Sequence, residues 1–424
     1  MLLRTTRAEL ALALTAALTT GAACSSGSPT SAGPLDASAD RAVTTHGDSG
    51  LGHSSGSGTG AGSGTGTGQD SGSGFDAGSG VDGGGGPGFD AGKMGPGSGS
   101  GSGHMKHDAG MCGFETSCNG ECVDTASNPQ NCGGCGIACG GTCSGGRCVI
   151  TLTSVVNNPV ALAVDATNIY FSDFGLSAVT KVPIAGGPPV ALASGQDYPD
   201  SLAVTADEVY WVNSKGDTLM SVPIAGGTPT TLLSGLSGPG GVAVNATDVY
   251  CADGFGVREL ALDGGAPTTL ASAQNSPYGV ALDTTNLYFT DYAPSMSGSV
   301  VQVALTGGAP VTIAPAQSNP TGLAAYAGNV YWTNSGTVGA VLTVPVNGGT
   351  VVTLAQGRSN PTTLVVDATG VYWLESNSVM TMPLSGGSLT TLVSNVNEPG
   401  GLAIDATSVY WSDGLKGIQK LTPK

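Results

Sequence analysis

The chain has 424 residues, a formal net charge of −17 at pH 7 and 71 glycines. A chain of this length can bury a large hydrophobic core. Its excess of acidic over basic groups disfavours nucleic acids and anionic membrane surfaces as partners, because both bind through basic patches.

Residues 1–23 have the pattern of an export signal, in which basic residues precede a short apolar run and small residues precede Cys24. The apolar run is too short to span a bilayer as a permanent helix. The sequence Gly-Ala-Ala-Cys resembles a bacterial lipobox, although Gly21 stands where lipoboxes usually have Leu. The resemblance implies that Cys24 is lipidated, which predicts an outer-membrane or cell-surface lipoprotein attached to the membrane only through its N-terminal lipid. Ordinary secretion is the alternative, because Gly21 and Ala23 also fit general signal cleavage.

Residues 24–110 consist mostly of Gly, Ser, Asp, Ala and Thr. This composition cannot bury enough apolar surface to offset chain entropy, so we expect a disordered tether. All the histidines of the chain lie in it, and we interpret them as solvated residues rather than metal ligands: His46, His53, His104 and His107.

Residues 111–148 contain eight cysteines, namely Cys112, Cys118, Cys122, Cys132, Cys135, Cys139, Cys143 and Cys148. An even number at this density after an export signal predicts a disulfide module, and the sequence leaves 105 pairings open. A redox Cys-x-x-Cys site at Cys132 and a zinc site are less favoured alternatives, because the module would be exported and contains no histidine. The segment resembles a short Cys-rich module of predicted exported lipoproteins from myxobacteria.

Residues 149–424 contain a repeat of about 40 residues. Each repeat has a proline, then a tyrosine motif such as VYWTN or VYWSD eleven residues later, and all but the last continue into a Gly-Gly pair. The motif tyrosines are Tyr170, Tyr210, Tyr250, Tyr288, Tyr331, Tyr372 and Tyr410. The pattern predicts four short strands per repeat, with the last two joined by a Gly-Gly hairpin. Seven such units indicate an all-β fold, a seven-bladed β-propeller.

The tyrosine motifs resemble those of YWTD-type propellers and of related NHL-like propellers. Proteins of those families usually have six blades, whereas this sequence has seven repeats.

The last repeat lacks a fourth strand, and residues 149–159 match the fourth-strand pattern of residues 390–399. We therefore expect the N-terminal strand of the propeller to complete the C-terminal blade, which would close the ring and remove its open sheet edges.

The length variation among the repeats falls between the tyrosine motif and the Gly-Gly pair. Because antiparallel strands alternate in direction, this variable loop and the loop that carries the proline should share one face of the propeller. Rigid scaffolds usually carry their binding residues on such loops. The aromatic and sulfur-containing residues there form the predicted binding face: Tyr198, Tyr278, Tyr292 and Met296.

An acid or amide follows each motif tyrosine by three residues: Asp173, Asn213, Asp253, Asp291, Asn334, Glu375 and Asp413. A ring of oxygens could hold calcium, but repetition in every blade favours a role in capping turns, and we expect no metal site. Cys251 replaces Trp or Phe of the other motifs, which predicts a buried, inert thiol.

The repeats also resemble propellers of the virginiamycin-lyase and lactonase types, which rely on histidine acid–base groups or on a carboxylate-bound metal. Residues 149–424 contain no histidine, so no Ser-His-Asp or Cys-His set can form there. Acid–base chemistry would instead need an Asp, Glu or Lys with a strongly shifted pKa.

The sequence therefore predicts a non-enzymatic binding or scaffold module. We expect a monomer without a cofactor, whose partner is an extracellular glycan, peptide or matrix polymer. The alternative is a calcium-dependent, carboxylate-based hydrolase, lactonase or lyase.

Overall fold

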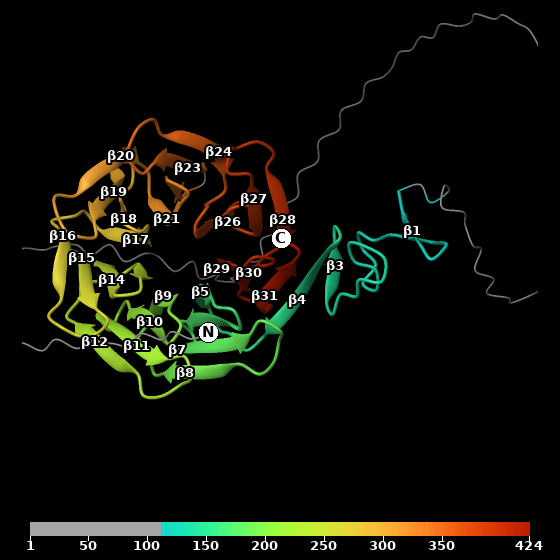
Figure 1. Ribbon diagram of the computed structural model, residues 1–424, viewed down its shortest axis with the longest axis horizontal. Coiled ribbons are helices and arrows are strands. Elements are labelled where there is room, and N and C mark those ends of the chain that lie inside the picture. Colours follow the sequence, from blue (N-terminus) through green and yellow to red (C-terminus); the bar gives the residue numbers. More distant parts are fainter. Residues whose placement is uncertain (1–111, 113, 337) are drawn as a thin grey trace, which may run out of the picture. The chain divides into compact units, whose positions relative to one another are not determined.

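The computed structural model describes residues 112, 114–336 and 338–424, all of whose regular elements are strands (Figure 1). The predicted signal peptide, the predicted tether and the lipidation site Cys24 lie outside these residues. In the described part of the chain, no helix is long and apolar enough to cross a membrane.

Seven sheets of antiparallel strands form the propeller, as predicted (Figure 1). The first blade contains β5 (Pro159–Val164), β6 (Asn168–Asp173), β7 (Ala178–Pro183) and β8 (Val190–Ser194). The second contains β9 (Pro199–Val204), β10 (Glu208–Asn213), β11 (Thr218–Pro223) and β12 (Thr230–Ser234). The third contains β13 (Val242–Val244), β14 (Asp248–Asp253), β15 (Gly256–Ala261) and β16 (Thr268–Ser272).

The remaining blades repeat this order. The fourth contains β17 (Pro277–Leu282), β18 (Asn286–Asp291), β19 (Gly298–Ala304) and β20 (Val311–Gln317). The fifth contains β21 (Pro320–Tyr326), β22 (Asn329–Asn334), β23 (Gly339–Pro345) and β24 (Val352–Arg358). The sixth contains β25 (Leu364–Asp367), β26 (Gly370–Glu375), β27 (Ser378–Met382) and β28 (Thr390–Ser394).

The seventh blade joins the two ends of the propeller. Its chain-terminal strands are β29 (Leu402–Ile404), β30 (Val409–Asp413) and β31 (Gly417–Thr422), and its outer strand is β4 (Arg147–Thr153). Thr151 of β4 pairs with Gln419 of β31, just as Thr391 of β28 pairs with Met380 of β27 in the sixth blade. The predicted closure by the N-terminal strand is confirmed.

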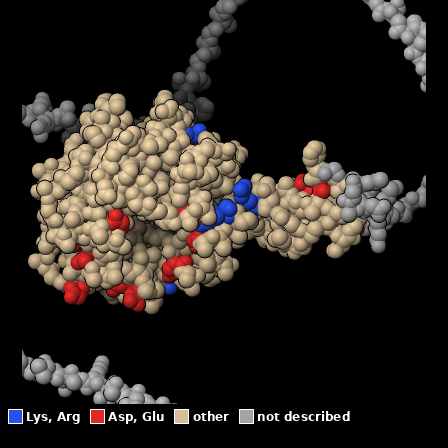
Figure 2. Space-filling model, turned by 45° about the horizontal axis from the view of Figure 1, so that its top comes forward, with Lys and Arg blue, Asp and Glu red and all other residues tan. Residues whose placement is uncertain are grey.

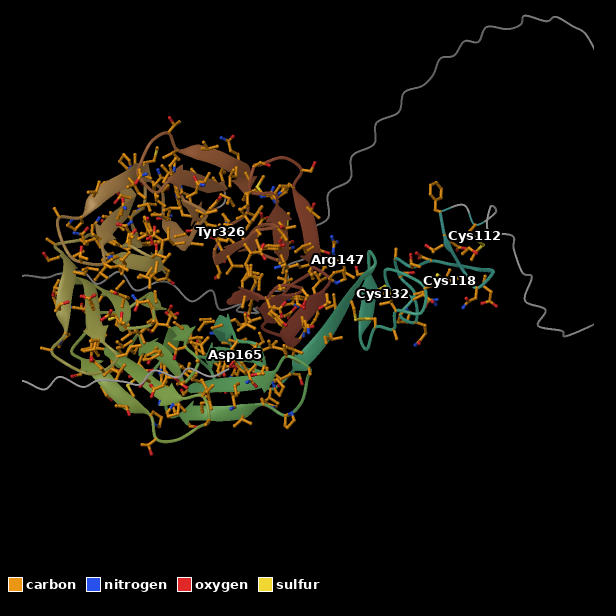
Figure 3. The ribbon with its side chains drawn as sticks, viewed as in Figure 1. Cys112, Cys118, Cys132, Arg147, Asp165 and Tyr326 are labelled. Carbon is orange, nitrogen blue, oxygen red and sulfur yellow. A yellow bond between two sulfur atoms is a disulfide. The ribbon has the colours of Figure 1, made fainter. Side chains whose placement is uncertain are left out.

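Side chains fill the spaces between the strands of the ring (Figure 3), and the tyrosine motif supplies the core between neighbouring blades. Successive strand residues point to opposite faces of a sheet, so the tyrosine packs toward one neighbour and the following Trp, Phe or Cys toward the other. Tyr288 of the fourth blade, for example, shares a buried cluster with Trp332 of the fifth. Tyr410 of the seventh blade packs with Phe171 of the first, which completes the ring. The motif residues are thus structural.

Most of the turns between the first and second strands are organised by the side chain of their first residue. The Asp165 carboxylate accepts the backbone N–H groups of Thr167 and Asn168 and the hydroxyl of Tyr170. In the fourth blade, the hydroxyl of Tyr288 likewise donates a hydrogen bond to the Asp283 carboxylate, at 2.6 Å between the oxygen atoms. The motif tyrosine therefore packs two blades with its ring and fixes a turn with its hydroxyl.

The cysteine module has three short strands, β1 (Thr116–Cys118), β2 (Glu121–Val123) and β3 (Thr142–Ser144). Its eight cysteines form four disulfides, as predicted: Cys112–Cys122, Cys118–Cys135, Cys132–Cys143 and Cys139–Cys148. Strand β3 pairs with the start of β4, so the module and the seventh blade share one sheet.

Candidate functional site

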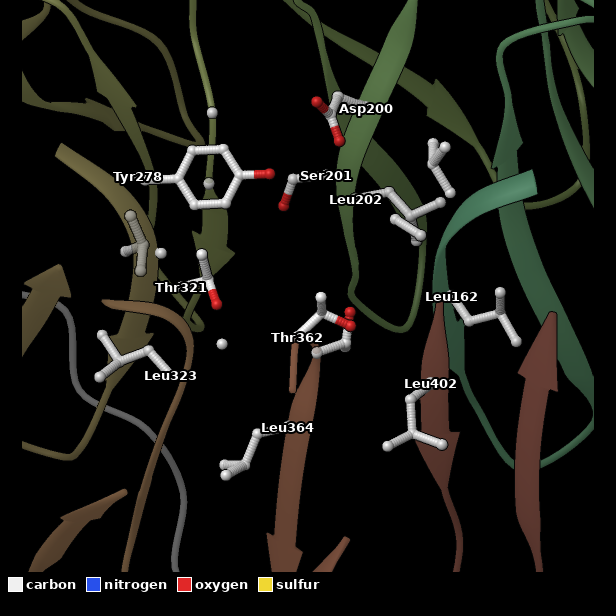
Figure 4. Close-up of a pocket in the computed structure, with 18 of the residues that line it drawn as sticks. Leu162, Asp200, Ser201, Leu202, Tyr278, Thr321, Leu323, Thr362, Leu364 and Leu402 are labelled. Atoms are coloured by element: carbon white, nitrogen blue, oxygen red, sulfur yellow. The ribbon is translucent and has the colours of Figure 1, made fainter. Parts of the chain in front are cut away.

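A cavity of about 320 Å³ opens among the innermost strands of the blades. Its lining comes from β5, β9, β17, β21, β25 and β29 and from the glycines before β13, so every blade contributes (Figure 4). We call this cavity the axial pocket. The axial pocket lies where the inner strands begin, directly after the proline loops. These loops belong to the face of the propeller for which the sequence predicted binding.

The three residues that follow each proline form three layers along the inner strands, and most of them line the axial pocket. The first layer differs from blade to blade and contains Val160, Asp200, Gly240, Tyr278, Thr321, Thr362 and Gly400. The second layer is small: Ala161, Ser201, Gly241, Gly279, Gly322, Thr363 and Gly401. The third layer is apolar: Leu162, Leu202, Val242, Val280, Leu323, Leu364 and Leu402. Chemical variety is therefore concentrated in the first layer.

Close approach of the inner strands explains the small second layer. A Cβ atom on Gly279 would lie 2.4 Å from the carbonyl oxygen of Thr321, and one on Gly322 would lie 2.2 Å from that of Thr362. These carbonyl oxygens belong to the backbone, so they cannot move aside as the end of a flexible side chain could. The glycines thus set the width of the pocket, and larger side chains project into it from the first layer.

Asp200 is the only carboxylate among the residues that line the axial pocket. Its side chain is partly buried. Burial raises the pKa of Asp200 to about 6, despite the hydrogen bond that it accepts from the backbone N–H of Ser201. A carboxyl group with this pKa is available both as an acid and as a base near neutral pH. Acid–base chemistry without histidine requires such a group, and the sequence motifs did not identify it.

Tyr278 lies near Asp200 and Ser201 in the axial pocket, with its hydroxyl directed toward them (Figure 4). Burial and the nearby charge of Asp200 raise the pKa of Tyr278 to about 12. The phenol therefore keeps its proton at neutral pH and can donate a hydrogen bond to a ligand. Of the residues predicted for the binding face, Tyr278 is the one that lines the pocket.

The other predicted binding residues lie outside the axial pocket. The rings of Tyr292 and Tyr278 are 6.1 Å apart, so the structure brings this pair together as expected. Met296 is 64% exposed on the long loop of the fourth blade. Tyr198 instead contacts Phe174, at 5.2 Å between ring centroids, and Lys215, whose Nζ atom lies 3.3 Å from the ring centroid.

The acids and amides that follow the motif tyrosines by three residues accept hydrogen bonds from turns or pair with residues of neighbouring loops and strands. The Asp173 carboxylate accepts the backbone N–H groups of Asn157 and Leu176, and Glu375 forms a two-pronged ion pair with Arg358. Among the described residues, no group of three or more His, Cys, Asp or Glu side chains is placed to hold a metal ion.

Cys251 is fully buried and is the one free cysteine of the described residues. Burial raises the pKa of its thiol to about 12, which keeps it protonated and unreactive, as predicted.

A signal for Asp200 is present in the sequence. Aligning the repeats on their prolines shows that only one of the residues immediately after them is acidic. Comparison of the tyrosine motifs and loop lengths does not reveal this position, which is why it was missed.

No protein-family model matches the chain, and no curated protein matches it. Among solved structures, virginiamycin B lyase from Staphylococcus aureus superposes with a TM-score of 0.56 at 15% identity, covering 66% of this chain and 99% of its own. A streptogramin B lyase gives the same TM-score and identity, covering 66% of this chain and 98% of its own. A computationally designed protein, Ika8, has a TM-score of 0.48 at 16% identity and covers 65% of this chain and 98% of its own.

The expectation that the protein is not an enzyme is contradicted by these lyase structures, which share its fold over nearly their whole length. At 15% identity the likeness shows the fold alone, so any reaction has to be argued from the residues of this chain.

Proposed function

We propose that the protein is an enzyme of the lyase type that acts on a small, uncharged organic molecule bound in the axial pocket. The observation that carries the proposal is the position of Asp200, the sole carboxylate lining this cavity, opposite the hydroxyl of Tyr278. The lyase structures that share the fold support an elimination reaction.

The proposed step begins when the Asp200 carboxylate accepts a proton from a carbon atom of the ligand. The electron pair of that C–H bond forms a carbon–carbon double bond, and the bond from the neighbouring carbon to the leaving group breaks. The leaving group departs with the electron pair of its bond and is then protonated. The Tyr278 hydroxyl donates a hydrogen bond to the ligand atom on which negative charge develops. A carboxylate base paired with a tyrosine donor is a known arrangement for abstracting a proton from carbon.

The surroundings of the axial pocket favour an uncharged ligand. Asp200 and Tyr278 are the ionisable side chains that line it, and no Lys or Arg side chain does. A ligand with a carboxylate or phosphate would meet Asp200 without a compensating cation. The part of the surface seen in Figure 2 carries Asp and Glu side chains as well as Lys and Arg, on a chain with a net charge of −17, so long-range attraction of an anionic ligand is weak there.

The pH dependence of catalysis tests the role of Asp200. With a panel of compounds that carry a leaving group beside an acidic C–H bond, kcat/KM should rise with pH through about 6 and then level, because only the ionised carboxylate accepts the proton. Asp200→Asn should lower kcat/KM by at least about 100-fold and remove the inflection.

Two comparisons make this experiment decisive. Thr362→Val changes another first-layer side chain and should retain the inflection near pH 6. The products should together have the mass of the substrate, whereas hydrolysis would add one water. Full activity in Asp200→Asn would refute the proposal.

We also propose that the enzyme works outside the cytoplasm. Four disulfides in the cysteine module support an oxidising environment. Attachment through a lipid at Cys24 remains part of this proposal, and mass spectrometry of the mature N-terminus tests it.

A further inference from the structure

Ser201 lines the axial pocket next to Asp200 and lies on the inner strand β9. Its Oγ atom accepts a hydrogen bond from the backbone N–H of Val242 at 3.0 Å. That contact uses a lone pair of the oxygen and leaves the hydroxyl proton to be donated elsewhere. Among the described residues, Ser201 Oγ makes no other hydrogen bond with a protein group.

The second layer of the axial pocket contains one other hydroxyl, that of Thr363, and it serves a different purpose. Thr363 donates its proton to the carbonyl oxygen of Gly400 at 2.8 Å, so this hydroxyl is already used within the protein. The remaining positions of the layer are alanine and glycine. Ser201 is therefore the second-layer residue with a proton to offer a ligand.

The hydroxyls of Ser201 and Tyr278 face the same part of the axial pocket (Figure 4). Burial and the neighbouring Asp200 raise the pKa of Tyr278 and keep the phenol protonated, so both groups are donors at neutral pH. Two donors that converge from different blades suit one oxygen atom with two lone pairs.

We propose that Ser201 and Tyr278 together bind one carbonyl oxygen of the ligand, which makes the substrate an ester, lactone, amide or ketone. This inference rests on the proposed function, because it places the reacting C–H bond beside that carbonyl group and near Asp200. When Asp200 accepts the proton, the electron pair of the C–H bond forms a double bond to the carbonyl carbon, and the π pair of the carbonyl group moves onto its oxygen to give an enolate. The oxygen pair then re-forms the carbonyl group, the carbon–carbon double bond shifts to the next carbon, and the leaving group departs from that carbon with the electron pair of its bond. The two hydroxyls stabilise the enolate oxygen and undergo no net change.

A binding measurement tests the two donors without turnover. The probe is γ-butyrolactone labelled with ¹³C at its carbonyl carbon, which has no leaving group on the carbon next to its acidic C–H bond. Isotope-edited infrared spectroscopy of the bound lactone reports the hydrogen bonds to its carbonyl oxygen. Ser201→Ala should move the carbonyl stretch to higher wavenumber and raise Kd about 3- to 10-fold, as expected for one lost hydrogen bond. Ser201→Thr keeps the hydroxyl and should restore both values.

Thr363→Val is the matched control, because it removes the other second-layer hydroxyl and also leaves a backbone group without its partner. It should lower the melting temperature but leave the carbonyl stretch and Kd at their wild-type values. Equal effects of Ser201→Ala and Thr363→Val on the spectrum, or no lactone bound to the wild-type protein, would overturn the inference. If the spectral difference appears but no compound is ever eliminated, the carbonyl site stands and the proposed reaction fails.

Discussion

Asp291 is a buried carboxylate with few hydrogen-bond donors around it to stabilise its charge. It is 8% exposed, its Oδ1 atom has no hydrogen-bond partner among the described residues, and Ser299 approaches its Oδ2 atom only at 3.4 Å. Burial raises the pKa of Asp291 to about 6, although hydrogen bonds from the backbone N–H of Asn275 and from Ser299 act to lower it. At the equivalent position of the second blade, Asn213 donates to Gln196 at 3.1 Å. An uncharged side chain therefore suits this site better than an ionised one.

Asp291→Asn should stabilise the protein by about 1–3 kcal/mol at pH 8. Because the folded-state pKa lies above the ordinary aspartate value of 3.8, the aspartate destabilises the fold increasingly as pH rises from about 4 to 6, and fully above that. The gain should thus vanish near pH 3. Thermal unfolding at both pH values measures it. An equal gain at pH 3 would show that charge is not the cause, and Asp173→Asn, at a well-partnered site, should give no gain.

At the scale of the element, most turns between the first and second strands depend on one aspartate or on an Asn or Thr at the same position. Asp405 accepts hydrogen bonds from the backbone N–H groups of Thr407 and Ser408 and from the hydroxyl of Tyr410. Burial acts to raise the pKa of Asp405, but these hydrogen bonds outweigh it and lower the pKa below its usual value. The turn and the inner edge of the blade are thus stabilised by the ionised carboxylate.

Asp405→Ala should lower the free energy of unfolding by about 1–3 kcal/mol at pH 7, because it leaves several donors without an acceptor. Since the folded-state pKa is depressed, the wild-type advantage is present above the ordinary aspartate pKa of 3.8 and is lost as pH falls through the folded-state value. Denaturant titrations should show this difference in the free energy of unfolding between wild type and Asp405→Ala at pH 7, and a smaller difference at pH 3. Asp263→Ala, at an exposed turn, is the control and should change little; equal losses in both variants would argue against the specific role of the turn.

At the scale of the whole molecule, stability depends on joining residues far apart in the chain. Strand β4 lies more than 260 residues before β31 in sequence and pairs with it along most of its length, from Cys148 to Thr153. Leu152 from β4 is buried with Tyr410 and Ile418 of the seventh blade and Phe171 of the first. The outer strand therefore completes a core that two blades share.

A chain that begins at Val155 should lose the cooperative unfolding transition of the propeller, because the seventh blade would lack its outer strand and expose a sheet edge. A chain that begins at Cys112 retains β4 and serves as the control. Circular dichroism melts and differential scanning calorimetry measure the transition. A chain from Val155 that melts at the same temperature and with the same enthalpy as the control would contradict ring closure as a source of stability.

The architecture could be predicted from the amino-acid sequence because the same pattern of strand and turn residues occurs seven times. The proline, the tyrosine motif and the Gly-Gly pair recur at nearly regular spacing, and each copy can bury its apolar face only against its neighbours. Ring closure also followed from sequence, since the N-terminal segment matches the strand that the last repeat lacks. The presence of a disulfide framework followed from the cysteine count, although the pairing did not.

The set of residues that share the axial pocket could not be predicted from the sequence, because it depends on how the blades pack. Asp200, Ser201 and Tyr278 come from different repeats, and their proximity depends on how closely the glycines let the inner strands approach. The pKa of Asp200 likewise depends on burial by neighbouring blades, which no local pattern contains. The repeated residues specify the contacts that the blades have in common, whereas the candidate site is formed by first-layer residues that differ from blade to blade.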